Sequence, residues 1–125
     1  MKLFKTFFIF LLLSFTALSY SDEIDDMFKE ISSELNRTIA GMNIDPITTL
    51  KNTSYINFGE RILTYNYTLK KDVEIDWKVV QNSATSMYCS NPDTKIVLDY
   101  VNVQMSYYSK TGVFLNQFKF SKSDC

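Results

Sequence analysis

The sequence contains no histidine. This absence excludes Ser-His-Asp triads, Cys-His dyads, histidine-ligated zinc and histidine general bases. Neither a GxGxxG nor a GxxxxGK[ST] phosphate-binding pattern occurs, and the two cysteines do not have the CxxC spacing of a redox motif. We therefore expect no catalytic residue, no cofactor and no metal site, and we interpret the chain as a non-enzymatic protein.

Glycine and proline are also scarce, with three and two residues, whereas aromatic residues make up 15% of the chain. This composition is typical of a packed globular domain and excludes a disordered tail. Beyond the first residues, no apolar segment reaches the roughly 20 residues that span a bilayer. The sequence thus predicts one globular domain with no membrane span once its leader is removed.

The leader begins with a short basic region containing Lys2 and Lys5, and an apolar run follows over residues 7–13. Small residues come next, as at a signal-peptidase site. We predict a signal peptide over residues 1–21, cleaved before Tyr20 or before Asp22, and a single domain over residues 22–125. An uncleaved anchor is the alternative, but the run is short for one. No cysteine lies near the exit, which argues against a lipid anchor.

Cleavage changes the charge of the domain. Removing Lys2 and Lys5 from the 13 basic residues leaves 11 against 14 acidic residues, a net charge of about −3. A mildly acidic surface disfavours nucleic acid and anionic membranes as partners. We expect a periplasmic or secreted domain whose partner is another protein or an envelope component.

Two cysteines remain in the exported domain, Cys89 and Cys125. An even number of cysteines in an exported chain predicts a disulfide, and only one intramolecular pairing exists. Closing that loop would stabilise the fold by about 3.5–4 kcal/mol in the chain-entropy model. An intermolecular disulfide and two free thiols are the alternatives.

Apolar residues at steps of three and four predict a first helix over residues 22–42. The stripe comprises Ile24, Met27, Phe28, Ile31, Leu35, Ile39 and Met42. Acidic residues crowd its first turn: Asp22, Glu23, Asp25 and Asp26. They could form a cation site, but a helix start favours negative charge by its dipole alone, and we prefer that interpretation.

The rest of the domain alternates between strands and helices. We predict strands over residues 47–58 and 61–69, a helix over 73–88, a short helix from Pro92 to Asp99 that Asn91 opens, and strands over 101–108 and 113–121. The order is an N-terminal helix and then ββααββ. The predicted fold class is α+β, with the helices on one face of a four-stranded antiparallel sheet and one disulfide.

Two groups of side chains are candidates for a site. Carboxylate catalysis needs two acids across a cleft, and Glu60, Glu74, Asp76, Asp93 and Asp99 are candidates, although all lie at predicted turns or helix starts. Four tyrosines could stack on a sugar or a peptide: Tyr65, Tyr67, Tyr107 and Tyr108. The first three share the parity of aliphatic neighbours, so we expect them in the core. Tyr108 has the opposite parity and is the best exposed candidate.

Several short motifs occur in a fixed order: residues 63–69 read LTYNYTL, Tyr88-Cys89 precedes Asn91-Pro92, residues 105–108 read MSYY, Gly112 follows, and the chain ends in Ser-Asp-Cys. This order resembles a group of small, exported, uncharacterised bacterial proteins with a "YNYxL … C … YxY … G … DC" pattern. The resemblance implies an exported α+β domain with a Cys89–Cys125 disulfide, and it supplies no catalytic residue. The chain departs from the group at residues 100–102, where Tyr-Val-Asn stands in place of a glycine.

The leading hypothesis is a non-enzymatic periplasmic interaction domain that binds its partner through a sheet face or edge. The second is a periplasmic inhibitor or immunity protein against a toxin or a lysozyme. Both kinds of protein are small, exported, acidic and disulfide-bonded, so composition does not separate them. A compact hydrolase that uses carboxylates ranks third.

Overall fold

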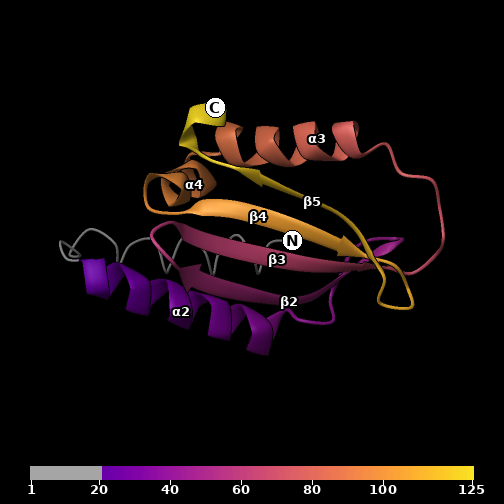
Figure 1. Cartoon of the computed structure of the whole chain (residues 1–125), viewed down its shortest axis with the longest axis horizontal. Helices are drawn as coiled ribbons and strands as arrows, with labels where there is room; N and C mark the ends of the chain where they lie inside the picture. The colour runs from indigo at the N-terminus through magenta and orange to yellow at the C-terminus, as the bar shows by residue number, and fades with distance from the viewer. Residues whose placement is uncertain (1–20) are drawn as a thin grey trace.

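The structure is a computed structural model, and it describes residues 21–125. The predicted signal peptide therefore lies, except for Ser21, outside the described residues. A five-stranded sheet forms the centre of the fold, and helices pack against it (Figure 1). The elements are α2 (Ser21–Thr38), β1 (Asn43–Asp45), β2 (Thr48–Asn57), β3 (Arg61–Leu69), α3 (Trp77–Ser90), α4 (Pro92–Lys95), η2 (Ile96–Asp99), β4 (Asn102–Tyr108), β5 (Phe114–Phe120) and η3 (Lys122–Asp124).

The α+β class is confirmed, but the prediction of four antiparallel strands is wrong in two respects. The strand order is β1-β2-β3-β4-β5, so β1 adds a fifth strand, and β3 pairs with β4 in parallel. The register places Ile62 beside Asn102 and Thr68 beside Tyr108. The parallel pairing arises because α3, α4 and η2 carry the chain back along the sheet, so that β4 begins where β3 began.

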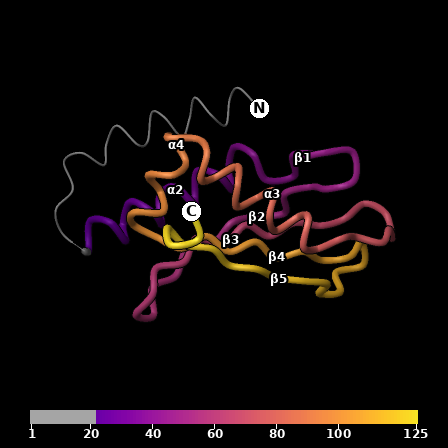
Figure 2. Tube along the Cα trace, turned by 90° about the horizontal axis from the view of Figure 1, so that it is seen from above, coloured from indigo at the N-terminus to yellow at the C-terminus, as the bar shows by residue number. Residues whose placement is uncertain are grey.

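The helices α2, α3 and α4 all lie on one side of the sheet, as predicted (Figure 2). The core between the helices and the sheet is apolar and aromatic. Its residues with at most 3% exposure are Phe28, Ile31, Leu35, Leu50, Leu63, Tyr65, Leu69, Val97, Val101, Val103 and Phe120. The alternation of β3 and β4 explains this arrangement, because every second side chain points toward the helices. We call this side the helix face and the opposite side the open face.

The ends of α2 and α3 differ from the predicted ranges. Helix α2 ends at Thr38, four residues before the predicted end, because the chain turns at Gly41 (φ +86°) to pair β1 with β2. Helix α3 begins only at Trp77, where the Asp76 side chain accepts a hydrogen bond from the Val79 N–H (3.3 Å). Since Asp76 is an N-cap, residues 73–75 lie outside the helix. Asn91 caps α4 through the Asp93 N–H, as predicted.

None of the helices in residues 21–125 is both long and apolar enough to cross a membrane.

Candidate functional site

Helix α3 leaves much of its apolar surface uncovered. Of its residues, only Tyr88 is fully buried, whereas Val79 is 61% exposed and Met87 is 66% exposed. The sequence pattern predicts one apolar face for this helix, with Val73, Trp77, Val80, Ala84 and either Met87 or Tyr88. Val80, Ala84 and Tyr88 do pack in or against the core, whereas Met87 and Val73 are exposed. Val79, an apolar residue outside the predicted face, was the one sequence feature that pointed to this surface.

An apolar groove runs between α3 and the sheet, with a volume of about 360 Å³. Its lining combines α3, the β1 segment, the residues before α3 and the far ends of β3 and β4. The lining residues used below are Ile44, Asp45, Tyr67, Trp77, Val79, Val80, Met87, Met105 and Tyr107. We call this feature the α3 groove.

Three aromatic rings in contact form the floor of the α3 groove. The Tyr67 and Tyr107 rings lie 5.0 Å apart between centroids, and the Trp77 ring lies 5.1 Å from Tyr107 at a tilt of 57°. Such pairs contribute about 0.5–1.5 kcal/mol beyond the area that they bury. The register of β3 and β4 places Tyr67 beside Tyr107, and the start of α3 adds Trp77. Two of the three rings of the floor are therefore positioned by the sheet and the third by α3.

One charged group stands at the edge of the α3 groove. Burial, and then the neighbouring Asp45 carboxylate, raise the pKa of Tyr107 to about 12. The Tyr107 hydroxyl thus stays protonated at neutral pH. Asp45 itself is exposed at the end of β1. The groove can accept apolar side chains on its floor and a cationic group at Asp45.

Tyr65 and Tyr67 are buried in the core as predicted, whereas Tyr107, also expected in the core, is only half-buried, and Tyr108 is half-buried on the opposite face. Tyr65 and Tyr67 are 3% and 8% exposed, and the Tyr65 hydroxyl lies 2.9 Å from that of Tyr88. Tyr107 is half-buried in the groove. Tyr108 lies on the open face, where its ring contacts Phe114. These tyrosines do not form one platform, because neighbouring residues of a strand point to opposite faces.

The candidate carboxylates do not gather into a catalytic pair in the described residues. Asp76 is the N-cap of α3, and Asp93 lies in the first turn of α4. Glu74 is exposed in the segment before α3. Glu60 accepts from Lys119 Nζ at 2.8 Å, and this lysine first, then Asn102, lowers the pKa of Glu60. Asp99 pairs with Lys122 at 2.8 Å. Three separate pockets are each lined by one aspartate side chain: Asp45, Asp99 or Asp124.

The acidic start of α2 is not a metal site in the described residues, which contain no group of three or more metal-ligating side chains. Asp25 instead binds the sheet. It accepts from the Tyr55 hydroxyl at 2.5 Å, from Asn57 Nδ2 at 3.1 Å and from Arg61 Nε at 3.0 Å. The hydrogen bond from Tyr55 is the largest cause that lowers the pKa of Asp25. One member of the predicted cluster therefore fastens α2 to β2 and β3.

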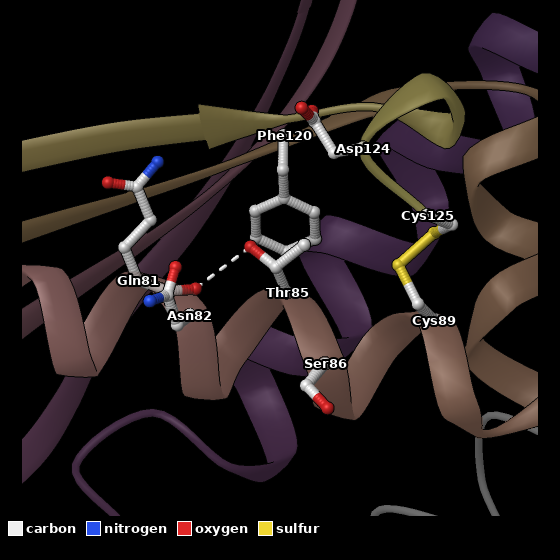
Figure 3. A pocket seen from close by; sticks show the side chains of 8 residues that line it. All are labelled: Gln81, Asn82, Thr85, Ser86, Cys89, Phe120, Asp124 and Cys125. Atoms are coloured by element: carbon white, nitrogen blue, oxygen red, sulfur yellow. Dashed lines mark hydrogen bonds between the residues drawn. A yellow bond between two sulfur atoms is a disulfide. The ribbon is translucent and has the colours of Figure 1, made fainter.

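A second hollow, of about 430 Å³, lies between α3 and the C-terminal residues (Figure 3). The Cys89–Cys125 disulfide forms one end of it, with the two Cα atoms 5.4 Å apart. Gln81, Thr85 and Phe120 form the other walls. Figure 3 shows Gln81, Asn82, Thr85 and Ser86 along α3 beneath the C-terminal segment. The disulfide thus holds the last turn of α3 against the end of β5, where Tyr88 meets Phe120 edge-on at 5.3 Å.

Neither a protein-family model nor a curated protein matches this chain in sequence. Solved structures match it in fold. A pilotin of the Vibrio vulnificus type 2 secretion system, EpsS, superposes with a TM-score of 0.70 at 11% identity, over 83% of this chain and 93% of that one. The type II secretion system pilotin AspS from Vibrio cholerae gives 0.65 at 16% identity, over 83% and 94%. A protein from Pseudomonas aeruginosa described as secreted gives 0.65 at 14% identity, over 87% and 99%. At these identities the likeness shows a shared fold.

Proposed function

We propose that this chain is an exported, non-enzymatic domain of the bacterial envelope that binds another protein through the α3 groove. The observation that carries the proposal is the apolar surface of α3 beside an aromatic floor. Val79 and Met87 are exposed although the core beneath them is complete. Exposed apolar surface around a groove is typical of sites that bind a partner.

The fold supports the same function. Two of the similar structures are pilotins of type II secretion systems, and a third is described as secreted. We infer a pilotin-like role, in which the partner is a component of an envelope secretion apparatus. Two observations support a periplasmic or secreted location. Most of residues 35–125 resemble small exported bacterial proteins, and the disulfide needs an oxidising compartment.

The groove defines the chemistry of the partner segment. Its floor takes apolar side chains, and the exposed Asp45 at its edge favours a lysine or arginine on the guest. An amphipathic helix with an apolar stripe and a basic flank supplies both groups at i, i+3 and i+4 spacing. The sequence led to a sheet face or edge as the binding surface, whereas the apolar surface lies between α3 and the sheet.

Tryptophan fluorescence tests this proposal, because Trp77 is the only tryptophan of the chain and lies in the groove. A photo-crosslinking residue at Val79, introduced in the native host, would capture the partner for identification by mass spectrometry. A synthetic peptide of the captured segment should then shift the Trp77 emission to the blue. A crosslinker at Glu30, on the exposed side of α2, is the control position.

The substitution Val79→Asp should weaken peptide binding at least about tenfold, because it brings an unpaired carboxylate into an apolar contact. Gln81→Asp adds the same charge on α3 outside the groove lining and is the matched control. Equal capture from Val79 and Glu30, or equal affinity of both variants, would falsify the proposal. Hydrolysis of peptidoglycan or glycan by the purified domain would contradict its non-enzymatic part.

A further inference from the structure

The open face of the sheet carries two rows of polar side chains, and none of the helices in residues 21–125 covers it (Figure 2). The strand register aligns these rows across β2, β3, β4 and β5. One row is Asn52, Asn66, Ser106 and Gln117, and the other is Ser54, Thr64, Gln104 and Lys119. We call these eight residues the polar rows.

Hydrogen bonds between neighbouring strands order the polar rows. Asn66 Nδ2 donates to Asn52 Oδ1 at 2.8 Å. Gln117 Nε2 donates to the Ser106 hydroxyl at 3.1 Å. Thr64 and Ser106 are only 7% and 2% exposed, because neighbouring side chains lie across them.

This order distinguishes the polar rows from an ordinary solvated sheet face. Asparagine is disfavoured in strands, yet Asn52 and Asn66 stand opposite each other in the middle of the β2–β3 pair. A face that only contacts water is usually built from charged residues and threonine. Here amides and hydroxyls form a surface whose donors and acceptors are fixed before any ligand arrives, which lowers the entropic cost of binding.

The polar rows carry almost no free charge. Lys119 is their one ionic residue, and it donates to both carboxylate oxygens of Glu60 at 2.8 Å. A ligand on this surface is therefore recognised by hydrogen bonds and not by charge. That favours an uncharged, hydrogen-bonding chain over an acidic or basic peptide and over a phosphate.

Aromatic side chains border one end of the polar rows. The Tyr108 ring lies edge-on to Phe114 at 5.9 Å, and Lys51 Nζ lies 5.7 Å from the centroid of the Tyr108 ring. The contact with Tyr108 orients Phe114, and 54% of the Phe114 surface is exposed. An exposed aromatic ring beside a polar surface can pack against the C–H face of a sugar ring.

We propose that the polar rows and Phe114 bind a neutral glycan chain that carries N-acetyl groups. Acetamido and hydroxyl groups present paired donors and acceptors, as the Asn and Gln amides do. A glycan lying across the strands would meet a new strand every ~4.8 Å, close to the length of one sugar unit. This site is separate from the α3 groove and goes beyond the protein-binding function proposed above.

The test measures binding of the mature domain, residues 22–125, to a pentamer of β-1,4-linked N-acetylglucosamine by isothermal titration calorimetry and by NMR titration. Gln104→Ala removes a surface amide, and Phe114→Ala removes the exposed ring. Each variant should bind about 5- to 10-fold more weakly, which corresponds to one lost hydrogen bond or one lost stacking contact. NMR shifts should be confined to the open face. Both substituted side chains contact solvent, but Gln104 also donates to the Thr64 hydroxyl at 3.3 Å, so the melting temperature of each variant is measured to confirm that it stays folded during the titration.

Val79→Asp, in the α3 groove, is the control that separates this proposal from the preceding one. It should leave glycan affinity unchanged while it weakens peptide binding, and Gln104→Ala should do the reverse. Absence of pentamer binding, shifts that centre on α3, or equal affinity of Gln104→Ala and the wild type would each overturn the proposal. Binding that disappears between 50 and 200 mM salt would also overturn it, because that dependence indicates recognition of charge.

Discussion

Helices α2 and α3 pack on the same face of the same sheet, yet they bury very different surfaces. Phe28 and Leu35 of α2 are completely buried and Ile31 is 2% exposed. In α3, by contrast, Tyr88 is the only buried residue. The two helices therefore have different roles in the fold. The first completes the core, and the second leaves apolar side chains free for a partner.

The polar contacts of the two helices differ in the same way. Asn36 of α2 accepts from the Thr53 N–H at 2.5 Å and donates to its carbonyl at 2.9 Å, while the Ser32 and Thr53 hydroxyls lie 2.8 Å apart. Helix α3 is held by the Tyr65–Tyr88 hydroxyl contact and by the disulfide. The side chains of α2 thus bind the β2 backbone directly, and α3 depends on its last turn.

The largest expected effect on stability comes from removing a buried side chain of α2. Phe28→Ala should lower the free energy of unfolding by about 3–5 kcal/mol, because it opens a cavity in a closely packed core. The matched change on α3, Val79→Ala, should change it by less than about 0.5 kcal/mol, since the side chain is exposed. Urea unfolding followed by circular dichroism measures both. Similar losses in the two variants would contradict this difference between the helices.

The second prediction concerns the disulfide that holds the last turn of α3. The double variant Cys89→Ser/Cys125→Ser should lose about 3.5–4 kcal/mol of stability by the chain-entropy estimate for this loop. Adding reductant to the wild-type chain should lower its stability to that of the variant and leave the variant unchanged. Thermal unfolding with and without reductant checks this expectation. A variant as stable as the oxidised wild type would show that α3 needs no fastening.

A smaller loss should follow when α2 loses its contact with the backbone of β2. Asn36→Ala leaves the part-buried Thr53 N–H and carbonyl without their side-chain partner. We expect a loss of about 1–3 kcal/mol, measured by urea unfolding. Thr85→Ala is the control on α3, because the Thr85 hydroxyl bonds only its own helix at the Gln81 carbonyl (2.8 Å). It should leave stability within about 0.5 kcal/mol.

The smallest effect is a dependence on pH at the start of α2. Hydrogen bonds from Tyr55, Asn57 and Arg61 lower the pKa of Asp25 in the folded protein below its ordinary value of 3.8. A lowered folded pKa stabilises the fold above pH 3.8, and this stabilisation disappears as the pH falls through the folded pKa. Asp25→Asn should therefore be less stable at pH 7 and lose less stability between pH 5 and pH 2. Unfolding midpoints across that range measure the difference, and parallel curves for the two proteins would argue against it.

The sequence determined the elements better than their arrangement. The alternation of β3 predicted Arg61–Leu69 correctly, and the α2 stripe identified its buried residues. Alternation shows which side chains share a face, but it does not show which strand lies beside β4 or in which direction. The parallel β3–β4 pair therefore could not be read from the pattern. The three residues of β1 are too few to produce a pattern, and they pair only because β2 is already in place.

The candidate site was even less visible in the sequence. Trp77 was placed on the buried side of a helix that was expected to begin at residue 73. The structure starts that helix at Trp77 itself, beside Tyr107, which is 30 residues further along the chain. No local rule joins two such distant residues. The polar rows likewise depend on four strands aligning, and Tyr108 was the only open-face residue that the parity of its strand singled out.

The parallel β3–β4 pair has a consequence for how the molecule opens. The two strands contact each other directly, so the start of α3, ahead of the Cys89–Cys125 disulfide, could detach from the sheet while the central strand pair stays closed. Helix α3 would then form a separate cooperative unit whose opening costs less free energy than global unfolding. Its backbone amides should exchange with deuterium faster than those of β3 and β4. A guest in the α3 groove would slow that exchange, so that occupancy could be measured from the protection of the α3 amides.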